Sequence, residues 1–346
     1  MRRKLLVAAA SLTASLVVAE AALALLERRS GSEPVVPETI GRFDPQLGWA
    51  LRPGAVAVSR RAGQPVEYRI NSKGLRDDET SYEKPPGIFR IVLLGDSRAF
   101  GYGVPIEGHV SAVLEGYFRD VEVINMGVSG YGVDQELLLL QSEGLKYEPD
   151  LVIAYVDHYG DHRHLHTKRF GKRKPRFILR DGEPVLTGAP VPGRPTRGPR
   201  NALTAWLGRH SRLYRRAREA YHRLRSAEEP GSPEEPVGAG AASDEDDPTV
   251  QQELYDLGEA LVVAMDEASR ARGARFVLMT RIGRLHAGMQ KRGILSLAIN
   301  APLENPQFAL PGDLLHTNEA GNAVLAWVIA EFLRGQDLIP AHHLTP

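Results

Sequence analysis

The sequence predicts an α/β fold in which a parallel sheet is covered by helices on both faces. Three short, continuously apolar runs have the length of buried strands: 89–94, 121–124 and 151–156. Helical patterns separate these runs, at 110–118 and 135–145. Apolar strands that alternate with helices are typical of a parallel sheet buried on both faces. We therefore expect a three-layer α/β/α domain with about five parallel strands.

The same alternation returns in the C-terminal part of the chain. Helical patterns cover 250–271 and 319–333, and between them lie a strand at 275–279 and a weaker one at 294–299. The intervening residues 160–248 are rich in charged residues, Pro and Gly, and they end in an acidic low-complexity stretch. Such composition does not build a core, so we predict an insertion after the third strand.

The part of the chain before residue 88 lacks this alternation and predicts two further regions. Residues 1–29 combine a basic start with an apolar segment, as a membrane anchor or signal segment does. Residues 30–87 read as a linker followed by a small β-rich lead-in, with a candidate strand at 66–70. The main domain then spans 88–346.

The apolar segment at 5–26 has the length of a helix that spans a membrane. It carries one charged residue, Glu20, and roughly 20 apolar residues suffice to cross a bilayer. A cleaved signal peptide and a buried helix of the domain are the alternatives, but the stretch is long for a signal peptide. The basic residues 2–4 should stay in the cytoplasm. The main domain would then lie outside it, in the periplasm or at the cell surface.

The composition excludes several classes of function. Acidic and basic residues number 43 each, so no net charge attracts nucleic acid. The chain has no cysteine, which rules out disulfides, thiolate nucleophiles and cysteine zinc sites. The histidine-containing run 161–166 lies in a basic stretch and is interpreted as a solvated loop rather than a metal site. We expect neither a metal nor an organic cofactor.

A candidate nucleophile follows the first strand directly, in the sequence Gly95-Asp96-Ser97. Active sites of parallel sheets lie beyond the carboxyl ends of the strands, and glycine permits a tight turn there. The Ser97 hydroxyl would then stand clear of the sheet, beside the N–H groups and positive end of a following helix. A serine in this place is also a common helix N-cap.

A candidate acid and base, Asp313 and His316, lie three residues apart just before the last helix. Within a single turn, this spacing can bring the carboxylate to Nδ1 of the imidazole and leave Nε2 to accept the proton of Ser97. An ordinary surface loop is the alternative. The chain order of serine, aspartate and histidine nevertheless predicts a catalytic triad.

Two motifs resemble signature blocks of the SGNH/GDSL hydrolases. Residues 94–97 (LGDS) are similar to the first block, and 313–321 (DLLHTNEAG) are similar to the last, which precedes the C-terminal helix. The similarity covers roughly 88–158 and 250–334, and the lead-in at 44–76 resembles that of membrane-anchored bacterial members. The resemblance implies a flavodoxin-like, five-stranded sheet. It also implies a serine ester hydrolase of the carboxylesterase or deacetylase type.

The resemblance further implies an oxyanion hole with three donors. The backbone N–H groups of Ser97 and of Gly127, after the second strand, match the first two. The third is an Asn side chain after the third strand, where this chain has none and His158 is the best match. Asp157 beside it would oppose the developing negative charge if ionised. Three alternatives follow: His158 replaces the Asn, the site serves another reaction, or catalysis is lost.

These alternatives define the expected partners. A hydrolase would act on an acyl ester carried by a polysaccharide or a lipid. An O-acyltransferase would pass the acyl group to a cell-envelope polysaccharide, and a chain without catalysis would be a carbohydrate-binding or assembly protein. The membrane would be a partner through the N-terminal segment.

Overall fold

The computed structural model describes most of the main domain and short parts of the rest. The described residues are 11, 15–23, 38–59, 65–157, 163–193, 207, 211–214, 217, 248–299 and 305–345. The chain forms two compact units, 1–33 with 193–243 and 34–192 with 244–346. The second unit contains the central sheet and the candidate site.

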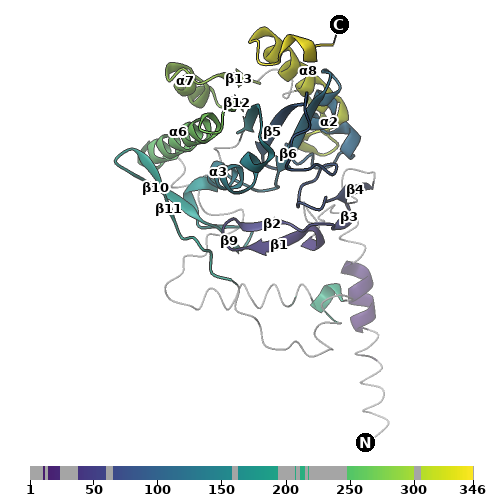
Figure 1. The fold of residues 1–346 in the computed structure, drawn as a ribbon. Helices are drawn as coiled ribbons and strands as arrows, with labels where there is room; N and C mark the ends of the chain where they lie inside the picture. Colours follow the sequence, from purple (N-terminus) through teal and green to yellow (C-terminus); the bar gives the residue numbers. More distant parts are fainter. Residues whose placement is uncertain are drawn as a thin grey trace, which may run out of the picture. The chain divides into compact units, whose positions relative to one another are not determined.

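The larger unit is built on a five-stranded parallel sheet (Figure 1). Its strands are β5 (Phe89–Gly95), β6 (Val121–Gly127), β7 (Leu151–Tyr155), β12 (Arg275–Thr280) and β13 (Ser296–Ala298). Their spatial order is β13-β12-β7-β5-β6, and every neighbouring pair is parallel. Counted along the chain, this is the order 2-1-3-4-5 of flavodoxin-like sheets. The predicted fold class is confirmed.

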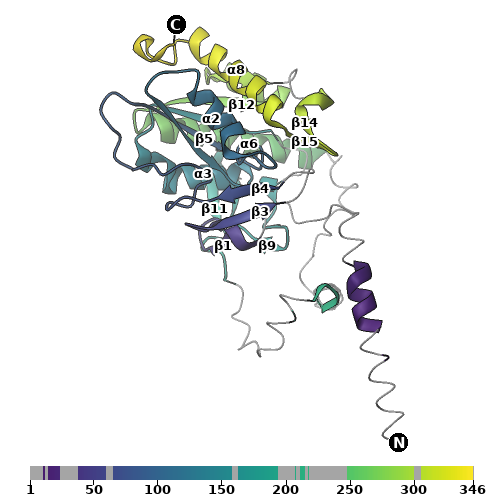
Figure 2. The same ribbon diagram turned by 90° about the vertical axis from the view of Figure 1, so that its right-hand side faces the viewer.

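Helices cover both faces of this sheet (Figure 2). One face packs against α3 (Val133–Ser142), α6 (Pro248–Arg270) and α7 (Gly283–Lys291). The other packs against α2 (Val110–Glu115) and α8 (Glu319–Gly335), which also contact each other. The molecule therefore has the three layers that the apolar runs predicted.

The side chains of β5 show why its sequence is apolar at nearly every position. Ile91 and Leu93 are buried on the α2 and α8 side, whereas Val92 and Leu94 are buried on the α3 and α6 side. Successive side chains of a strand point to opposite faces, so a strand covered on both sides needs apolar residues at every position. The strand that leads into the candidate site is thereby fixed in the middle of the core.

The β-rich lead-in consists of two antiparallel hairpins. The first pairs β1 (Gly41–Asp44) with β2 (Gly48–Leu51), and the second pairs β3 (Val56–Ser59) with β4 (Val66–Arg69). Trp49 of β2 and Tyr68 of β4 are buried with the α3 and α6 side of the core. The lead-in is thus packed onto the domain, and its strand predicted at 66–70 is β4.

The first part of the predicted insertion is also packed onto the domain. It forms the hairpins β8 (Lys168–Arg169) with β9 (Lys172–Arg173), and β10 (Arg176–Arg180) with β11 (Glu183–Thr187). Lys174 makes an ion pair with Asp134 of α3, and both side chains are fully buried. The acidic stretch at 227–247 lies outside the described residues.

The membrane anchor predicted at 5–26 is contradicted. Among the described residues, no helix combines the length and the apolar character that crossing a membrane requires. The transmembrane helix and the signal anchor are therefore wrong predictions, and the membrane is not supported as a partner.

The surroundings of Glu20 give a physical reason for this difference. Its carboxylate accepts hydrogen bonds from the Ser211 hydroxyl and the Leu213 N–H, each at 3.1 Å, and from the Arg212 N–H. Residues 212–214 are helical, so Glu20 satisfies free N–H groups at the start of that segment. The one charge of the apolar segment thus has polar protein partners within the smaller unit.

Candidate active site

Ser97 lies at the carboxyl end of β5, where a tight turn begins. Gly95 ends the strand with φ +154°, and a Cβ there would come within 2.8 Å of the Ala99 Cβ. The turn is closed by backbone hydrogen bonds from Phe100 N to Asp96 O at 2.9 Å and from Tyr102 N to Ser97 O at 3.0 Å. Residues 97–103 form turns, and the next α-helix is α2 (Val110–Glu115), which corresponds to the helix predicted at 110–118.

The lead-in holds the far side of this turn through Arg76. Its buried guanidinium donates to the backbone oxygens of Phe100 at 2.9 Å, Gly101 at 2.5 Å and Val104 at 2.6 Å. Burial lowers the pKa of Arg76 to about 10, which still leaves the side chain charged at neutral pH. The turn is therefore fixed by side-chain contacts from outside it rather than by a helix.

Asp313 and His316 lie on a short hairpin, which comes after the last strand of the central sheet and before α8 in the chain. It pairs β14 (Ala309–Leu310) with β15 (Asp313–Thr317), and the register shift leaves the residues between Asp313 and Thr317 bulged. In a regular strand, residues three apart point to opposite faces, and a bulge changes that direction. Asp313 Oδ1 also accepts from the Leu315 N–H at 3.0 Å. The single turn predicted from the spacing is thus a bulged strand.

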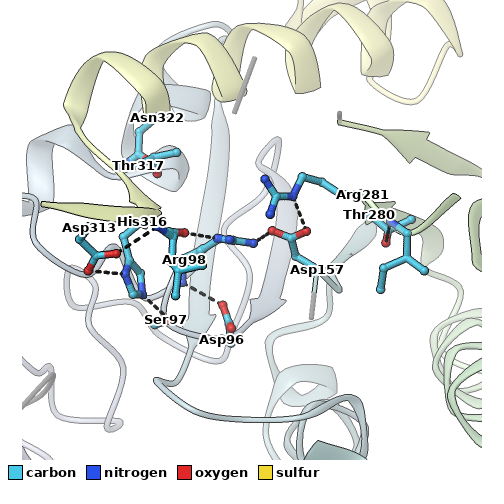
Figure 3. Close-up of polar contacts among 12 residues, drawn as sticks. Asp96, Ser97, Arg98, Asp157, Thr280, Arg281, Asp313, His316, Thr317 and Asn322 are labelled. Carbon is cyan, nitrogen blue, oxygen red and sulfur yellow. Dashed lines mark hydrogen bonds and ion pairs between the residues drawn. The ribbon is translucent and has the colours of Figure 1, made fainter. Parts of the chain in front are cut away.

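The structure brings Ser97, His316 and Asp313 together (Figure 3). His316 Nε2 lies 2.8 Å from Ser97 Oγ, and His316 Nδ1 lies 2.9 Å from Asp313 Oδ2. The Ser97 residue is 8% exposed, and the Tyr102 ring packs 4.6 Å from the imidazole. Burial lowers the pKa of His316, although Asp313 favours the charged form. A neutral imidazole can accept the hydroxyl proton at Nε2.

The predicted oxyanion donors are only partly described by the structure. The Gly127 N–H donates to Asn125 Oδ1 at 2.8 Å, so this group already has a partner within the protein. A Cβ on Gly127 would lie 2.1 Å from Phe100 N, and close backbone packing therefore requires glycine there. His158 lies outside the described residues. The donor roles of Ser97, Gly127 and His158 stay predictions.

Charged side chains that the sequence did not single out surround the nucleophile. Arg163, from the start of the insertion, donates to Asp96 Oδ2 at 2.7 Å and to Tyr131 O at 3.1 Å. This ion pair is almost fully buried. The residue before Ser97 is thereby tied to the loop that follows β6.

A second group of charges lies around Asp157. Arg98 makes an ion pair with Asp157 Oδ2, and Arg281 Nε donates to Asp157 Oδ1 at 2.8 Å. The Asp157 carboxylate, expected to oppose a developing negative charge, is therefore compensated by two guanidinium groups. Arg98 and Arg281 each follow the end of a strand, and that position was the one signal available in the sequence.

The histidine-containing run is partly described, and its described residues are not arranged as ligands of a metal ion. His164 is buried, and its Nε2 lies 2.8 Å from Leu254 O of α6. Within the described ranges, no three His, Asp or Glu side chains gather in a way that could hold a metal ion. His164 therefore contributes to the contact of the insertion with α6.

These features define a serine, histidine and aspartate site on a flavodoxin-like sheet, and similar solved structures exist. TesA is 16% identical, with 72% of this chain and 99% of that one covered and a TM-score of 0.38. A putative lipolytic protein of the G-D-S-L family from Desulfitobacterium hafniense is 14% identical, with 70% and 98% covered and a TM-score of 0.36. The psychrotrophic esterase EstA from Pseudoalteromonas sp. is 13% identical, with 71% and 97% covered and a TM-score of 0.39.

The comparisons by sequence give no match. No family model matches the chain, and no curated protein matches it significantly. One of the three solved structures is described as a protein of the G-D-S-L family, whereas the resemblance of this chain to SGNH/GDSL hydrolases rests on the two sequence motifs.

Proposed function

We propose that this chain is a serine ester hydrolase of the carboxylesterase or deacetylase type. The observation that carries the proposal is the continuous contact from the Ser97 hydroxyl through the His316 imidazole to the Asp313 carboxylate, at 2.8 and 2.9 Å. A buried hydroxyl beside a neutral imidazole is the arrangement that acyl transfer to serine needs. The two sequence motifs that resemble the SGNH/GDSL blocks favour an ester as the substrate.

In the first half of the proposed reaction, Ser97 Oγ attacks the acyl carbon and its proton passes to His316 Nε2. Asp313 stabilises the imidazolium and holds the ring in the required orientation. The carbonyl oxygen becomes an oxyanion, with the Ser97 N–H as the nearest donor and Gly127 and His158 as further candidates. The imidazolium then protonates the leaving alcohol, and an acyl group remains on Ser97.

In the second half, water replaces the alcohol. His316 accepts a proton from the water, whose oxygen attacks the acyl carbon, and a second oxyanion forms in the same place. The ester bond to Ser97 breaks, the proton returns to Ser97 Oγ, and the carboxylic acid leaves. No step requires a metal or an organic cofactor.

The charges around Ser97 favour the development of negative charge on the substrate. Asp96 and Asp157 carry two negative charges near the site, and Arg163, Arg98 and Arg281 compensate them at short range. An uncompensated carboxylate beside an oxyanion would raise the free energy of the transition state. The ion pairs remove this cost because they compensate both carboxylates.

Hydrolysis of p-nitrophenyl acetate by the full chain tests the proposal. We expect the wild type to release p-nitrophenol and the Ser97→Ala variant to fall to the uncatalysed rate. Ser142→Ala, in which the exposed hydroxyl at the end of α3 is removed, is the matched control and should keep the wild-type rate. Equal rates for the wild type and Ser97→Ala would remove Ser97 from the mechanism. A rate that appears only with an added sugar acceptor would favour O-acyl transfer instead.

A further inference from the structure

Arg98 connects the two halves of the candidate triad. It follows Ser97 directly in the chain, and its Nε donates to the backbone oxygen of Leu315 at 2.6 Å. Leu315 directly precedes His316. One hydrogen bond therefore joins the turn that carries the nucleophile to the strand that carries the base, across 217 residues of sequence.

The guanidinium of Arg98 is itself held in one orientation. Its side chain is 3% exposed and forms an ion pair with Asp157, whose side chain is 1% exposed and which lies two residues after the end of β7. Arg281, after β12, donates to the other oxygen of the same carboxylate (Figure 3). The ends of three neighbouring strands thus supply one network, in which Arg98 and Asp157 are buried and Arg281 is partly exposed.

The strand that carries His316 has little apolar support, and its polar contacts include one from the Thr317 hydroxyl to Asn322 of α8. β15 pairs with the two residues of β14 in a separate hairpin outside the central sheet. Leu314 and Leu315 are 71% and 60% exposed, so their side chains anchor the strand little. Apolar burial is what usually fixes a strand, and here a polar contact from Arg98 takes that place.

We propose that Arg98 is a positioning residue that sets the distance between Ser97 Oγ and His316 Nε2, and that Asp157 acts through Arg98. The catalytic consequence of this inference rests on the proposed function. The role needs arginine, because its planar fork can donate from Nε to Leu315 O while its Nη1 side forms the ion pair with Asp157. The ammonium of a lysine is a single point and cannot occupy both places.

Kinetics of the full chain test the proposal with Arg98→Lys, Asp157→Asn and the double variant. A displacement of about 1 Å in a reacting group can cost about 100-fold in rate. We expect Arg98→Lys to lower kcat for p-nitrophenyl acetate by about 10- to 100-fold and to leave KM within about threefold. Asp157→Asn alone should lower kcat by a smaller factor than Arg98→Lys does. Added to Arg98→Lys, it should cause no further loss of kcat. Arg284→Lys, which changes an exposed guanidinium on α7, is the matched control and should keep the wild-type kcat.

A second measurement separates this proposal from the proposed function, because it does not require turnover. Nuclear magnetic resonance of ring-labelled histidine reports the surroundings of His316 whether or not esters are cleaved. We expect Arg98→Lys to shift the His316 signals and to leave those of His109 unchanged, which shows that the variant is still folded. Unchanged His316 signals, or wild-type kcat in Arg98→Lys, would overturn the role of Arg98. Additive losses in the double variant would overturn the role of Asp157.

Discussion

At the scale of single residues, the chemistry depends on how His316 is held between two oxygens. Asp313 Oδ2 contacts Nδ1, and Ser97 Oγ contacts Nε2. Asp313 Oδ1 is fixed in turn by the Leu315 N–H. The carboxylate therefore selects the tautomer in which Nε2 is free to accept a proton.

Replacement of Asp313 by Asn should separate this orienting role from packing. The amide keeps the shape of the carboxylate but can donate to Nδ1, which favours the wrong tautomer and removes the charge that stabilises the imidazolium. We expect kcat to fall by about 10⁴-fold with little change in KM. Asp337→Asn, at a position outside the site, should have no effect. A loss of less than tenfold in Asp313→Asn would contradict the triad.

The pH dependence of kcat/KM follows from the burial of His316. Burial lowers the pKa of His316 below its ordinary value of 6.5, and the protonated ring cannot act as a base. Activity should therefore be constant at neutral pH and fall on the acid side, with a midpoint below 6.5. A steady-state profile measured between pH 4 and pH 8 checks this. A midpoint above that value would mean that the Asp313 charge outweighs burial.

The sequence predicted the reacting residues better than their supports. Ser97, Asp313 and His316 stood out because each lies beside a strand end or helix start and belongs to a recognisable short motif. Arg98 and Asp157 lie 59 positions apart in the sequence, and no local pattern marks two residues that pair only after the sheet forms. The partners of Arg163 and Arg281 could not be predicted from the sequence for the same reason.

At the scale of elements, the turn after β5 packs directly against the end of β6. Gly127 ends β6, and its missing side chain lets the backbone of Ala99 and Phe100 approach. This contact fixes the nucleophile turn against the neighbouring strand. It accounts for the glycine independently of any role in an oxyanion hole.

Gly127→Ala should therefore destabilise the fold as well as lower activity. A Cβ would lie 2.1 Å from Phe100 N and 2.4 Å from the Ala99 carbonyl carbon, so the backbone must shift. Overpacking of this kind costs about 1–3 kcal/mol, which urea denaturation can measure. Gly283→Ala, where a Cβ meets nothing within 4 Å at the start of α7, is the control. Equal stability of the two variants would contradict this packing.

Long periodic elements were predictable, and short polar ones were not. The helix predicted at 250–271 is α6 (Pro248–Arg270), and the strand predicted at 275–279 is β12 (Arg275–Thr280). Both bury a regular apolar pattern. The short helix α7 (Gly283–Lys291) buries only Leu285 and Met289, and the sequence analysis did not predict it. The helix predicted at 110–118 is present as the shorter α2 (Val110–Glu115).

At the scale of the whole molecule, the described start of the insertion is part of the core rather than an appendage. Lys174 pairs with Asp134 of α3, and Arg163 pairs with Asp96 beside the nucleophile. Neither link was visible in a stretch whose composition is basic and rich in proline and glycine. The prediction that the chain lies outside the cytoplasm stays a prediction, whereas the predicted membrane anchor is contradicted.

Lys174→Met tests how far the insertion contributes to global stability. It leaves the fully buried Asp134 carboxylate without its cation, and removal of one partner of a buried pair costs about 3–5 kcal/mol. Calorimetry or urea denaturation of the full chain measures this loss. The double variant Lys174→Met/Asp134→Leu removes both charges and should recover most of the stability. Wild-type stability in Lys174→Met alone would show that the two side chains are not a buried pair.

The central claim is that the hydroxyl of Ser97 is activated by His316 for attack on an acyl carbon. Reaction of the full chain with a fluorophosphonate probe, followed by mass spectrometry of the labelled peptide, tests it most directly. The account predicts a single adduct on Ser97, at a rate that His316→Ala lowers strongly. An adduct at another residue, or labelling of Ser97→Ala at the wild-type rate, would contradict it.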